Sequence, residues 1–177
     1  MDQKRSRNTL LAIAAFAIVL IPSHRALATD PVGFTGVTLA QGRYSRIDVT
    51  NYFVPPNYAV KPSPVWTSFE KTSGPSDLYV QSNSWDPGGS TGWHSHPGHS
   101  LIIVTQGTVT DYEGSDKNCT AHVYTAGQSF IDEGGPHVHI IRNETSSPAA
   151  TIAVQLIPAK QARRIDAPDP GNCHFAK

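Results

Sequence analysis

Short runs of alternating or β-branched residues, each closed by a turn rich in glycine or proline, fill the middle of this 177-residue sequence. No segment after residue 28 combines the 3.6-residue periodicity of a helix with capping residues. Regular short strands without helices are typical of a β-sandwich or a jelly roll, so we predict an all-β domain. The expected strands are 43–50, 77–85, 100–105, 108–112, 120–124, 128–131, 138–142 and 151–157.

Two His-x-His pairs are the strongest chemical signal. His94 and His96 form the first pair, and His137 and His139 form the second. Residues i and i+2 of a strand project from the same face, so His94 and His96 present two imidazoles together, and His139 brings a third from a later strand. Imidazole nitrogens are good ligands for divalent transition metals. The pattern predicts a metal site, and histidines with only a structural role are the alternative.

The first 28 residues have the layout of a secretory signal peptide. Three basic residues precede an apolar run at 10–21, and Ala26-Leu27-Ala28 follows it. A run of 12 residues is too short to span a bilayer comfortably. We therefore expect cleavage after Ala28 and a periplasmic or secreted protein with no stable membrane anchor. An uncleaved, membrane-tethered form is the alternative.

The 149 residues that remain are enough for one domain. Their net charge of −3 offers nothing that attracts nucleic acid or anionic lipid. We expect an irregular N-terminal arm with edge strands at 29–76, a barrel at 77–158, and a tail rich in proline and glycine at 159–177. Exposed strand edges and an irregular arm favour a homodimer, because pairing covers the edges.

Both cysteines, Cys119 and Cys173, lie in the exported part of the chain. An even pair in an exported protein predicts a disulfide, with two unpaired thiols as the alternative. The bridge would close a loop of about 54 residues and stabilise the fold by about 4 kcal/mol on the chain-entropy model. It would also tie the C-terminal tail to the barrel.

Glycines and histidines recur in two ordered groups: Gly88, His94, His96 and Gly107 in the first, and Gly127, His139 and Asn143 in the second. Together they resemble the two sequence motifs of the cupin superfamily. The resemblance covers about 78–157, and the stretch from Asp77 to the tail resembles exported bacterial single-domain cupins of uncharacterised function. It implies a double-stranded β-helix, the cupin jelly roll, with a metal held in its mouth by His94, His96 and His139.

One departure from the first motif bears on the chemistry. Ser100 and Leu101 occupy the positions at which the motif usually carries a glutamate. A site of three histidines alone would keep open coordination positions for dioxygen or an anionic substrate. Alternatively, His137 or His99 supplies a fourth nitrogen and gives a closed site, better suited to zinc and a structural role. Glu133 is a weaker candidate, as a carboxylate ligand from its turn.

Two functions follow from the resemblance, and no catalytic residue is assigned. The first is a metal-dependent dioxygenase acting on a small organic substrate, with iron, manganese, nickel or zinc as the metal. The second is a non-enzymatic cupin that binds a small molecule or a metal ion. Behind the metal ligands we expect Ser100, Asn143, which would fix the turn after His139, and Gln155, which would hydrogen-bond a ligand or another strand.

Overall fold

The computed structural model describes residues 28–54 and 65–175. This part of the chain contains strands and no helix, which confirms the all-β prediction. It therefore holds no helix long and apolar enough to cross a membrane. Apart from Ala28, the predicted signal peptide lies outside the described residues.

The strands follow one another with short connections, as the turn residues predicted. Most of the barrel strands begin and end within two residues of the expected positions. The strands are β1 (Val32–Tyr44), β2 (Asp48–Phe53), β3 (Trp66–Lys71), β4 (Ser76–Ser90), β5 (His94–Ser95), β6 (Ser100–Gln106), β7 (Thr108–Glu113), β8 (His122–Thr125), β9 (Ser129–Asp132), β10 (His139–Arg142), β11 (Ala149–Pro158) and β12 (Ile165–Asp166).

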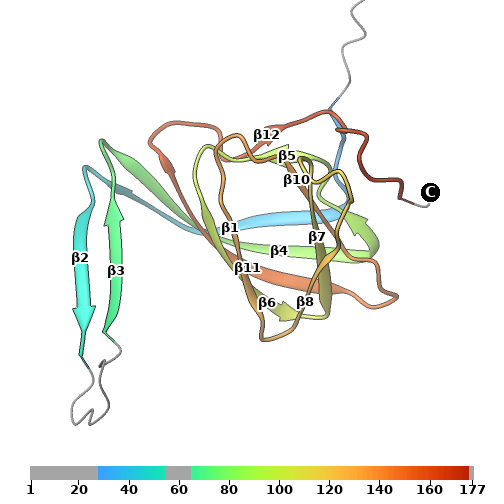
Figure 1. The fold of residues 1–177 in the computed structure, drawn as a ribbon, viewed down its shortest axis with the longest axis horizontal. Helices are drawn as coiled ribbons and strands as arrows, with labels where there is room; N and C mark the ends of the chain where they lie inside the picture. Colours follow the sequence, from blue (N-terminus) through green and yellow to red (C-terminus); the bar gives the residue numbers. More distant parts are fainter. Residues whose placement is uncertain (1–27, 55–64, 176–177) are drawn as a thin grey trace, which may run out of the picture.

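Ten of these strands form one sheet that folds back on itself into a nearly closed barrel (Figure 1). One layer has the order β1-β4-β11-β6-β9, and the other has the order β12-β5-β10-β7-β8. The two layers join where Ser90, at the end of β4, pairs with Arg142 of β10. All strand pairs in the sheet are antiparallel. This is the double-stranded β-helix that the cupin resemblance implied.

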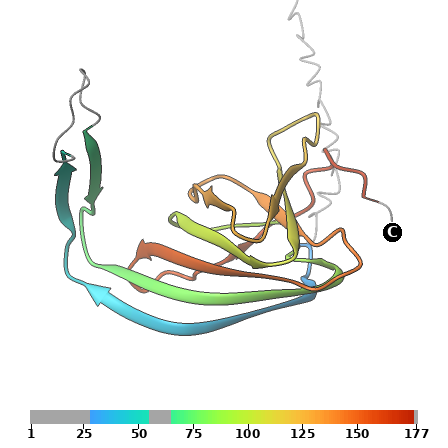
Figure 2. The ribbon, with the colours of Figure 1, turned by 90° about the horizontal axis from the view of Figure 1, so that it is seen from below.

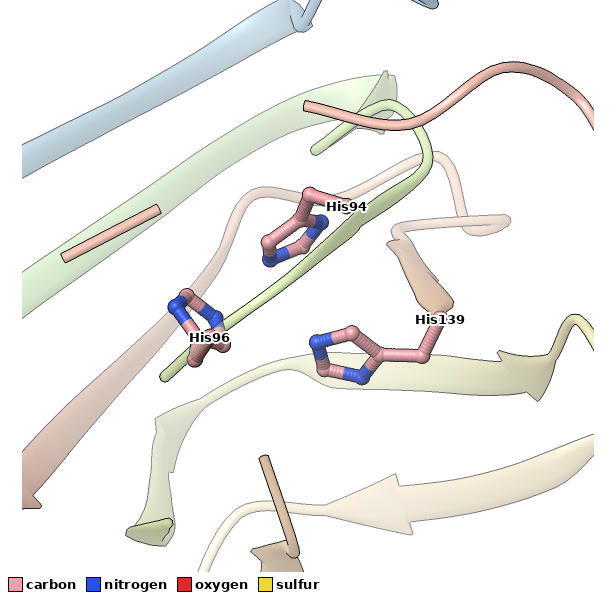
Figure 3. Close-up of side chains that lie close together, drawn as sticks. All are labelled: His94, His96 and His139. Carbon is pink, nitrogen blue, oxygen red and sulfur yellow. The ribbon is translucent and has the colours of Figure 1, made fainter. Parts of the chain in front are cut away.

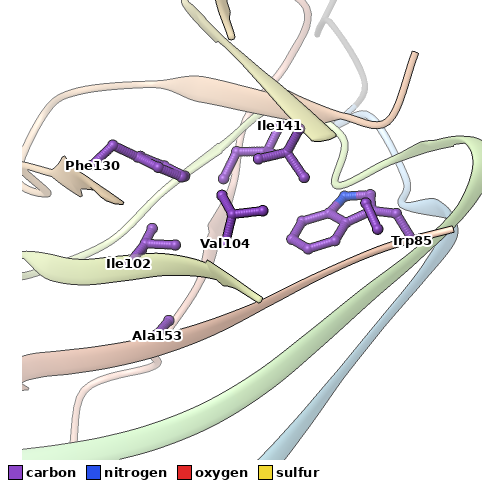
Figure 4. Close-up of a cluster of buried hydrophobic side chains, with 8 residues drawn as sticks. Trp85, Ile102, Val104, Phe130, Ile141 and Ala153 are labelled. Atoms are coloured by element: carbon purple, nitrogen blue, oxygen red, sulfur yellow. The ribbon is translucent and has the colours of Figure 1, made fainter. Parts of the chain in front are cut away.

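The main hydrophobic core lies between the two layers (Figure 4). Alternation along β6 builds part of it, because Ile102 and Val104 are buried while Leu101 and Ile103 face outward. Burying an aliphatic side chain of this size stabilises the fold by about 1.5–3 kcal/mol. The other buried members of the core are Trp85, Val109, Phe130, Ile141, Ala149 and Ala153.

The C-terminal tail covers the outside of the second layer. The predicted disulfide between Cys119 and Cys173 is present and fastens the tail there. Trp93 and Ile140 are buried beneath the tail, and the ring of Phe175 lies 6.3 Å from that of Trp93. The tail therefore supports β5 and β10 from behind, and these strands carry His94 and His139.

One strand expected in the segment before the barrel differs from the structure. The expected strand at 43–50 was wrong, because residues 45–47 separate the end of β1 from the start of β2. β1 pairs with β4 along most of its length, and its side chains are almost all exposed, so no hydrophobic alternation marked it. β2 and β3 form a separate hairpin, which stands apart from the barrel in Figures 1 and 2.

Candidate metal centre

Three of the four histidines in the two His-x-His pairs meet inside the barrel (Figure 3). His139, the first residue of β10, lies directly opposite His94 of β5 in the strand pairing, and His96 follows β5. One ring nitrogen from each lies within 4.8 Å of the other two. His94 and His139 are buried, and the side chain of His96 is 15% exposed. Sequence spacing and strand pairing thus assemble the predicted ligand set.

The backbone fixes the orientation of the first two rings. His94 Nδ1 lies 2.9 Å from the carbonyl oxygen of Gly92, and His96 Nδ1 hydrogen-bonds the carbonyl oxygen of Arg163. A carbonyl oxygen only accepts, so Nδ1 of each neutral ring carries the proton and donates it. The lone pair of each ring is therefore on Nε2, where a metal would be bound.

A carboxylate fixes the third ring. His139 Nδ1 donates to Asp111 Oδ1 at 3.1 Å, and His139 Nε2 is buried with no hydrogen-bond partner among the described residues. An orphaned imidazole nitrogen backed by a carboxylate on the other nitrogen is the arrangement typical of a metal-binding histidine. The residues present therefore fit a metal ion.

The pKa values of the three histidines shift in different directions because their surroundings differ. Burial lowers the pKa of His94 well below its usual value, and the charges of its neighbours lower it further. Burial also lowers the pKa of His96, although Asp132 acts against it. For His139, burial is outweighed by the hydrogen bond and charge of Asp111, and the pKa is raised. The rings of His94 and His96 are therefore uncharged at neutral pH, and each has a nitrogen lone pair, as metal binding requires.

Asp132 is a site residue that the sequence reasoning missed. Its Oδ2 lies 3.4 Å from His96 Nε2 and 3.9 Å from His139 Nε2, and its side chain is 3% exposed. Ser100 Oγ donates to the same oxygen at 3.3 Å, and the backbone N–H of Gly134 donates to Oδ1 at 2.9 Å. A buried carboxylate therefore lies beside the imidazoles of His96 and His139.

A signal for Asp132 was present in the sequence. It lies two residues after Phe130, a core residue, and the alternation of β9 places both side chains inside while Ile131 faces out. Glu133, the weaker candidate ligand, is the next residue, and its side chain is exposed.

The structure does not bring the two candidates for a fourth nitrogen ligand into this group. His137 is exposed, and its Nε2 lies 3.4 Å from the exposed carboxylate of Glu133. His99 is half-buried, with Nε2 3.9 Å from Glu70 of the β2–β3 hairpin. Both lie among surface charges instead of beside the three buried rings.

Asn143 and Gln155, which were expected to support the metal ligands, both make side-chain hydrogen bonds. Asn143 is fully buried, and its side-chain amide donates to the carbonyl oxygens of Asp86 and Ser147, which fixes the turn after β10. Gln155 on β11 donates from Nε2 to the same Arg163 carbonyl oxygen that anchors His96. The loop between β11 and β12 is therefore held at the site by hydrogen bonds from both His96 and Gln155.

A cavity of about 110 Å³ opens in front of the histidines. The three rings and Asp132 form part of its wall, and side chains from β1, β4, β6, β10, β11 and the β11–β12 loop also line it. A metal held by the rings would have protein ligands on one side and this cavity on the other. The arrangement leaves room for a small molecule to reach the metal.

Comparison with known families agrees with this structure. Residues 84–155 match the family model described as a cupin domain, a range that contains all three histidines and Asp132. The barrel segment of this chain therefore resembles a cupin domain in its sequence as well as in its fold. No curated protein is significantly similar to the chain.

Several solved structures are similar over about half of the chain. A protein with a double-stranded β-helix domain from Klebsiella pneumoniae is 22% identical over 51% of this chain and 74% of its own, with a TM-score of 0.43. A predicted oxalate decarboxylase from Thermotoga maritima is 18% identical over 48% of this chain and 82% of its own, with a TM-score of 0.39. An oxalate oxidase is 17% identical with a TM-score of 0.39, and the match covers 46% of each chain.

Proposed function

We propose that this protein is a metal-dependent cupin in which His94, His96 and His139 bind one divalent transition metal. The observation that carries the proposal is the convergence of three imidazoles, each held by a hydrogen bond at Nδ1, on the wall of a small cavity. Iron, manganese, nickel and zinc all accept imidazole nitrogen.

Asp132 supplies the carboxylate of this proposed site. Its position next to the Nε2 atoms of His96 and His139 allows it to bind the metal directly and to offset one of its two positive charges. Ser100 holds the carboxylate in place through its hydroxyl. A mixed set of imidazole and carboxylate with open positions is typical of non-haem iron oxygenases, and it favours iron or manganese over a structural zinc.

The activity that this geometry supports best is that of an oxygenase acting on a small organic substrate. When bound, a redox-active metal supplies the electron transfer to dioxygen that organic side chains cannot perform. The chain itself holds the ligand set rigid and surrounds the reacting molecule with buried walls that limit contact with water. A non-enzymatic cupin that binds a small molecule at the same metal is the second candidate.

Elemental analysis of the mature protein, combined with oxygen-uptake measurements, tests the proposal. We expect one transition metal per chain in the wild type and loss of it in His94→Ala and His139→Ala. The exposed His122→Ala is the matched control, and His137→Ala tests the alternative ligand; both keep the metal. Protein that stays metal-free after reloading contradicts the proposal. If the metal-loaded protein binds small molecules but consumes no oxygen, the result supports the second candidate, a non-enzymatic cupin.

We further propose that the protein works outside the cytoplasm. The disulfide supports this, because such bonds persist in oxidising compartments. The chain from Thr29 onward is fastened to the barrel, since Thr29 accepts a hydrogen bond from the Trp93 backbone and donates one to Ala167. Removal of residues 1–28 would leave these contacts intact. N-terminal sequencing of the exported protein should begin at Thr29, and an uncut N-terminus would argue for the tethered form.

We also propose that two copies of the chain associate through the β2–β3 hairpin. The hairpin exposes Trp66 and Phe69, and the outer face of the first barrel layer exposes Leu101, Ile103 and Ile131. Large exposed apolar patches mark interaction surfaces. Reciprocal packing of each hairpin on the other copy's barrel would cover both surfaces in one closed, symmetric dimer.

A further inference from the structure

Five buried polar atoms around the cavity lack a hydrogen-bond partner among the described residues. An unpaired buried polar group costs about 1–3 kcal/mol, so such atoms are rare in a folded protein. One other atom of this kind, on Asn172, lies elsewhere in the described chain. The five atoms are Asn83 Oδ1, Trp85 Nε1, His139 Nε2, Gln155 Oε1 and Arg164 Nη2, and all five residues line the cavity.

The proposed metal accounts for one of these atoms, His139 Nε2. The remaining four come from β4, from β11, which pairs with β4, and from the loop that follows β11. The atoms on Asn83, Gln155 and Arg164 restrict the chemistry of a ligand that would satisfy them.

Arg164 provides a positive charge at the cavity. Its Nε is paired with Asp166 at 2.5 Å, whereas Nη2 is buried and unpaired. Arg164 lines the same cavity as His94 and His96, and Asp166, two residues further on, pairs with His94 in the sheet. A guanidinium with a free N–H beside a metal site is well suited to a carboxylate.

Two of the remaining groups are hydrogen-bond acceptors. Gln155 donates from Nε2 to the Arg163 carbonyl oxygen, so its amide is oriented with Oε1 free. Asn83 donates from Nδ2 to Thr151 Oγ1 at 3.3 Å, which leaves Oδ1 free. Both oxygens need an O–H or N–H from a ligand, and a simple carboxylate has none to give.

The size of the cavity limits the ligand. A volume of about 110 Å³ is smaller than the engineered 150 Å³ protein cavity that holds benzene, so a ligand of about four to six non-hydrogen atoms fits. The ligand must therefore be very small and must carry its negative charge and its hydrogen-bond donor on neighbouring atoms.

We propose that the cavity binds a small hydroxycarboxylate or aminocarboxylate as the substrate or ligand of this protein. The carboxylate faces Arg164 and the metal. An ammonium group donates to both Gln155 and Asn83, and a hydroxyl donates to one of them. This inference rests on the proposed function, since the ligand occupies the open side of the same metal site. It adds the chemical class of the ligand and the residues that select it.

Calorimetric binding to wild-type protein of measured metal content tests the ligand class. The probes are lactate, alanine, propionate, lactamide and inorganic phosphate. We expect lactate or alanine to bind at least about 10-fold more tightly than propionate, because propionate leaves the two buried acceptors unpaired. We expect no measurable binding of lactamide, which lacks the negative charge, and weaker binding of phosphate.

Variants separate the two recognition elements. Arg164→Gln should weaken both lactate and propionate at least about 10-fold, while Arg164→Lys keeps the charge and restores part of the affinity. Gln155→Met should abolish the preference for lactate over propionate. Arg46→Gln, an exposed arginine before the hairpin, is the matched control and should change nothing. Thermal unfolding and metal content of each variant show whether the fold and the metal site are intact.

The outcomes distinguish this inference from the proposed function. Metal-loaded wild-type protein that binds lactamide or phosphate as well as lactate, or that binds none of the probes, overturns the ligand class and leaves the metal site standing. Protein without metal overturns the proposed function. In that case, lactate binding that depends on Arg164 would still support the ligand class, and its absence would contradict it.

Discussion

Ser100 stands directly opposite Asp132 in the pairing of β6 with β9, and its hydroxyl donates to the Asp132 carboxylate at 3.3 Å. Ser100 and Leu101 are the positions at which the first cupin motif usually carries a glutamate. In this chain a buried carboxylate beside His96 Nε2 comes instead from the neighbouring strand β9. The motif alone did not predict it.

Replacing Asp132 tests whether this carboxylate acts on the metal. Asp132→Asn should lower metal affinity about 10-fold or more, since it removes the charge while keeping the shape. Competition titration with a chelating dye measures the change. Glu133→Gln is the matched control, because this adjacent acid is exposed and points away from the site. Equal affinities of both variants and the wild type would mean that Asp132 is not part of the metal site.

The disulfide should support the metal site as well as the fold. The Cys119→Ser, Cys173→Ser double variant is expected to lose up to about 4 kcal/mol of stability on the chain-entropy model. It should also bind metal more weakly, because the tail no longer packs behind Trp93 on the strands that carry the histidines. Urea unfolding and metal titration measure the two effects. A large loss of stability with unchanged metal affinity would show that the tail does not support the metal site.

Acid should weaken the contact between β1 and the barrel. Arg43 donates two hydrogen bonds to the buried Asp77, and the Lys160 backbone N–H donates a third. Through the Arg43 hydrogen bonds first, these contacts lower the pKa of Asp77 from 3.8 to about 2. A carboxylate with a lowered pKa stabilises the fold above its unfolded pKa, and this contribution disappears as pH falls through the folded pKa.

The corresponding experiment compares wild type with Asp77→Asn across pH. The wild type should be more stable at neutral pH, and the difference should shrink between about pH 4 and pH 2. Asp48→Asn, which removes an exposed ion pair with Arg46, serves as the control and should have little effect at any pH. A stability difference at Asp77 that is constant with pH would refute the ionic origin.

The exposed hairpin should control the oligomeric state. Trp66→Ser with Phe69→Ser should convert the proposed dimer into a monomer, measured by light scattering coupled to size-exclusion chromatography. Val37→Ser, an exposed apolar residue on β1, is the control. A wild-type protein that is monomeric at high concentration would rule out the dimer, and a dimer that survives the hairpin substitutions would place the interface elsewhere.

Local patterns predicted those parts of the molecule that depend on local geometry. The alternation at 100–105 and 108–112 gave β6 and β7, and the i, i+2 spacing put His94 and His96 together. The contribution of Asp132 depends on the register of β6 against β9, which no single strand reveals. The exposed face of β1 gave no hydrophobic alternation to find.

The position of the β11–β12 loop could not be predicted from the sequence, for a similar reason. Its Arg163 carbonyl anchors His96 across 67 positions, and Arg164 enters the cavity from the same loop. A contact of this range follows from how the tail returns to β5, where β12 pairs with His94 and Ser95. No local pattern at 159–164 indicates that return, so the cavity wall became visible only in the folded chain.

Anomalous X-ray scattering from crystals of the metal-loaded protein, measured on both sides of the metal's absorption edge, tests the central claim most directly. The account predicts one strong peak bound by the Nε2 atoms of His94, His96 and His139, with the carboxylate of Asp132 beside it. No peak among these residues, or a peak held by His99 or His137, would contradict it.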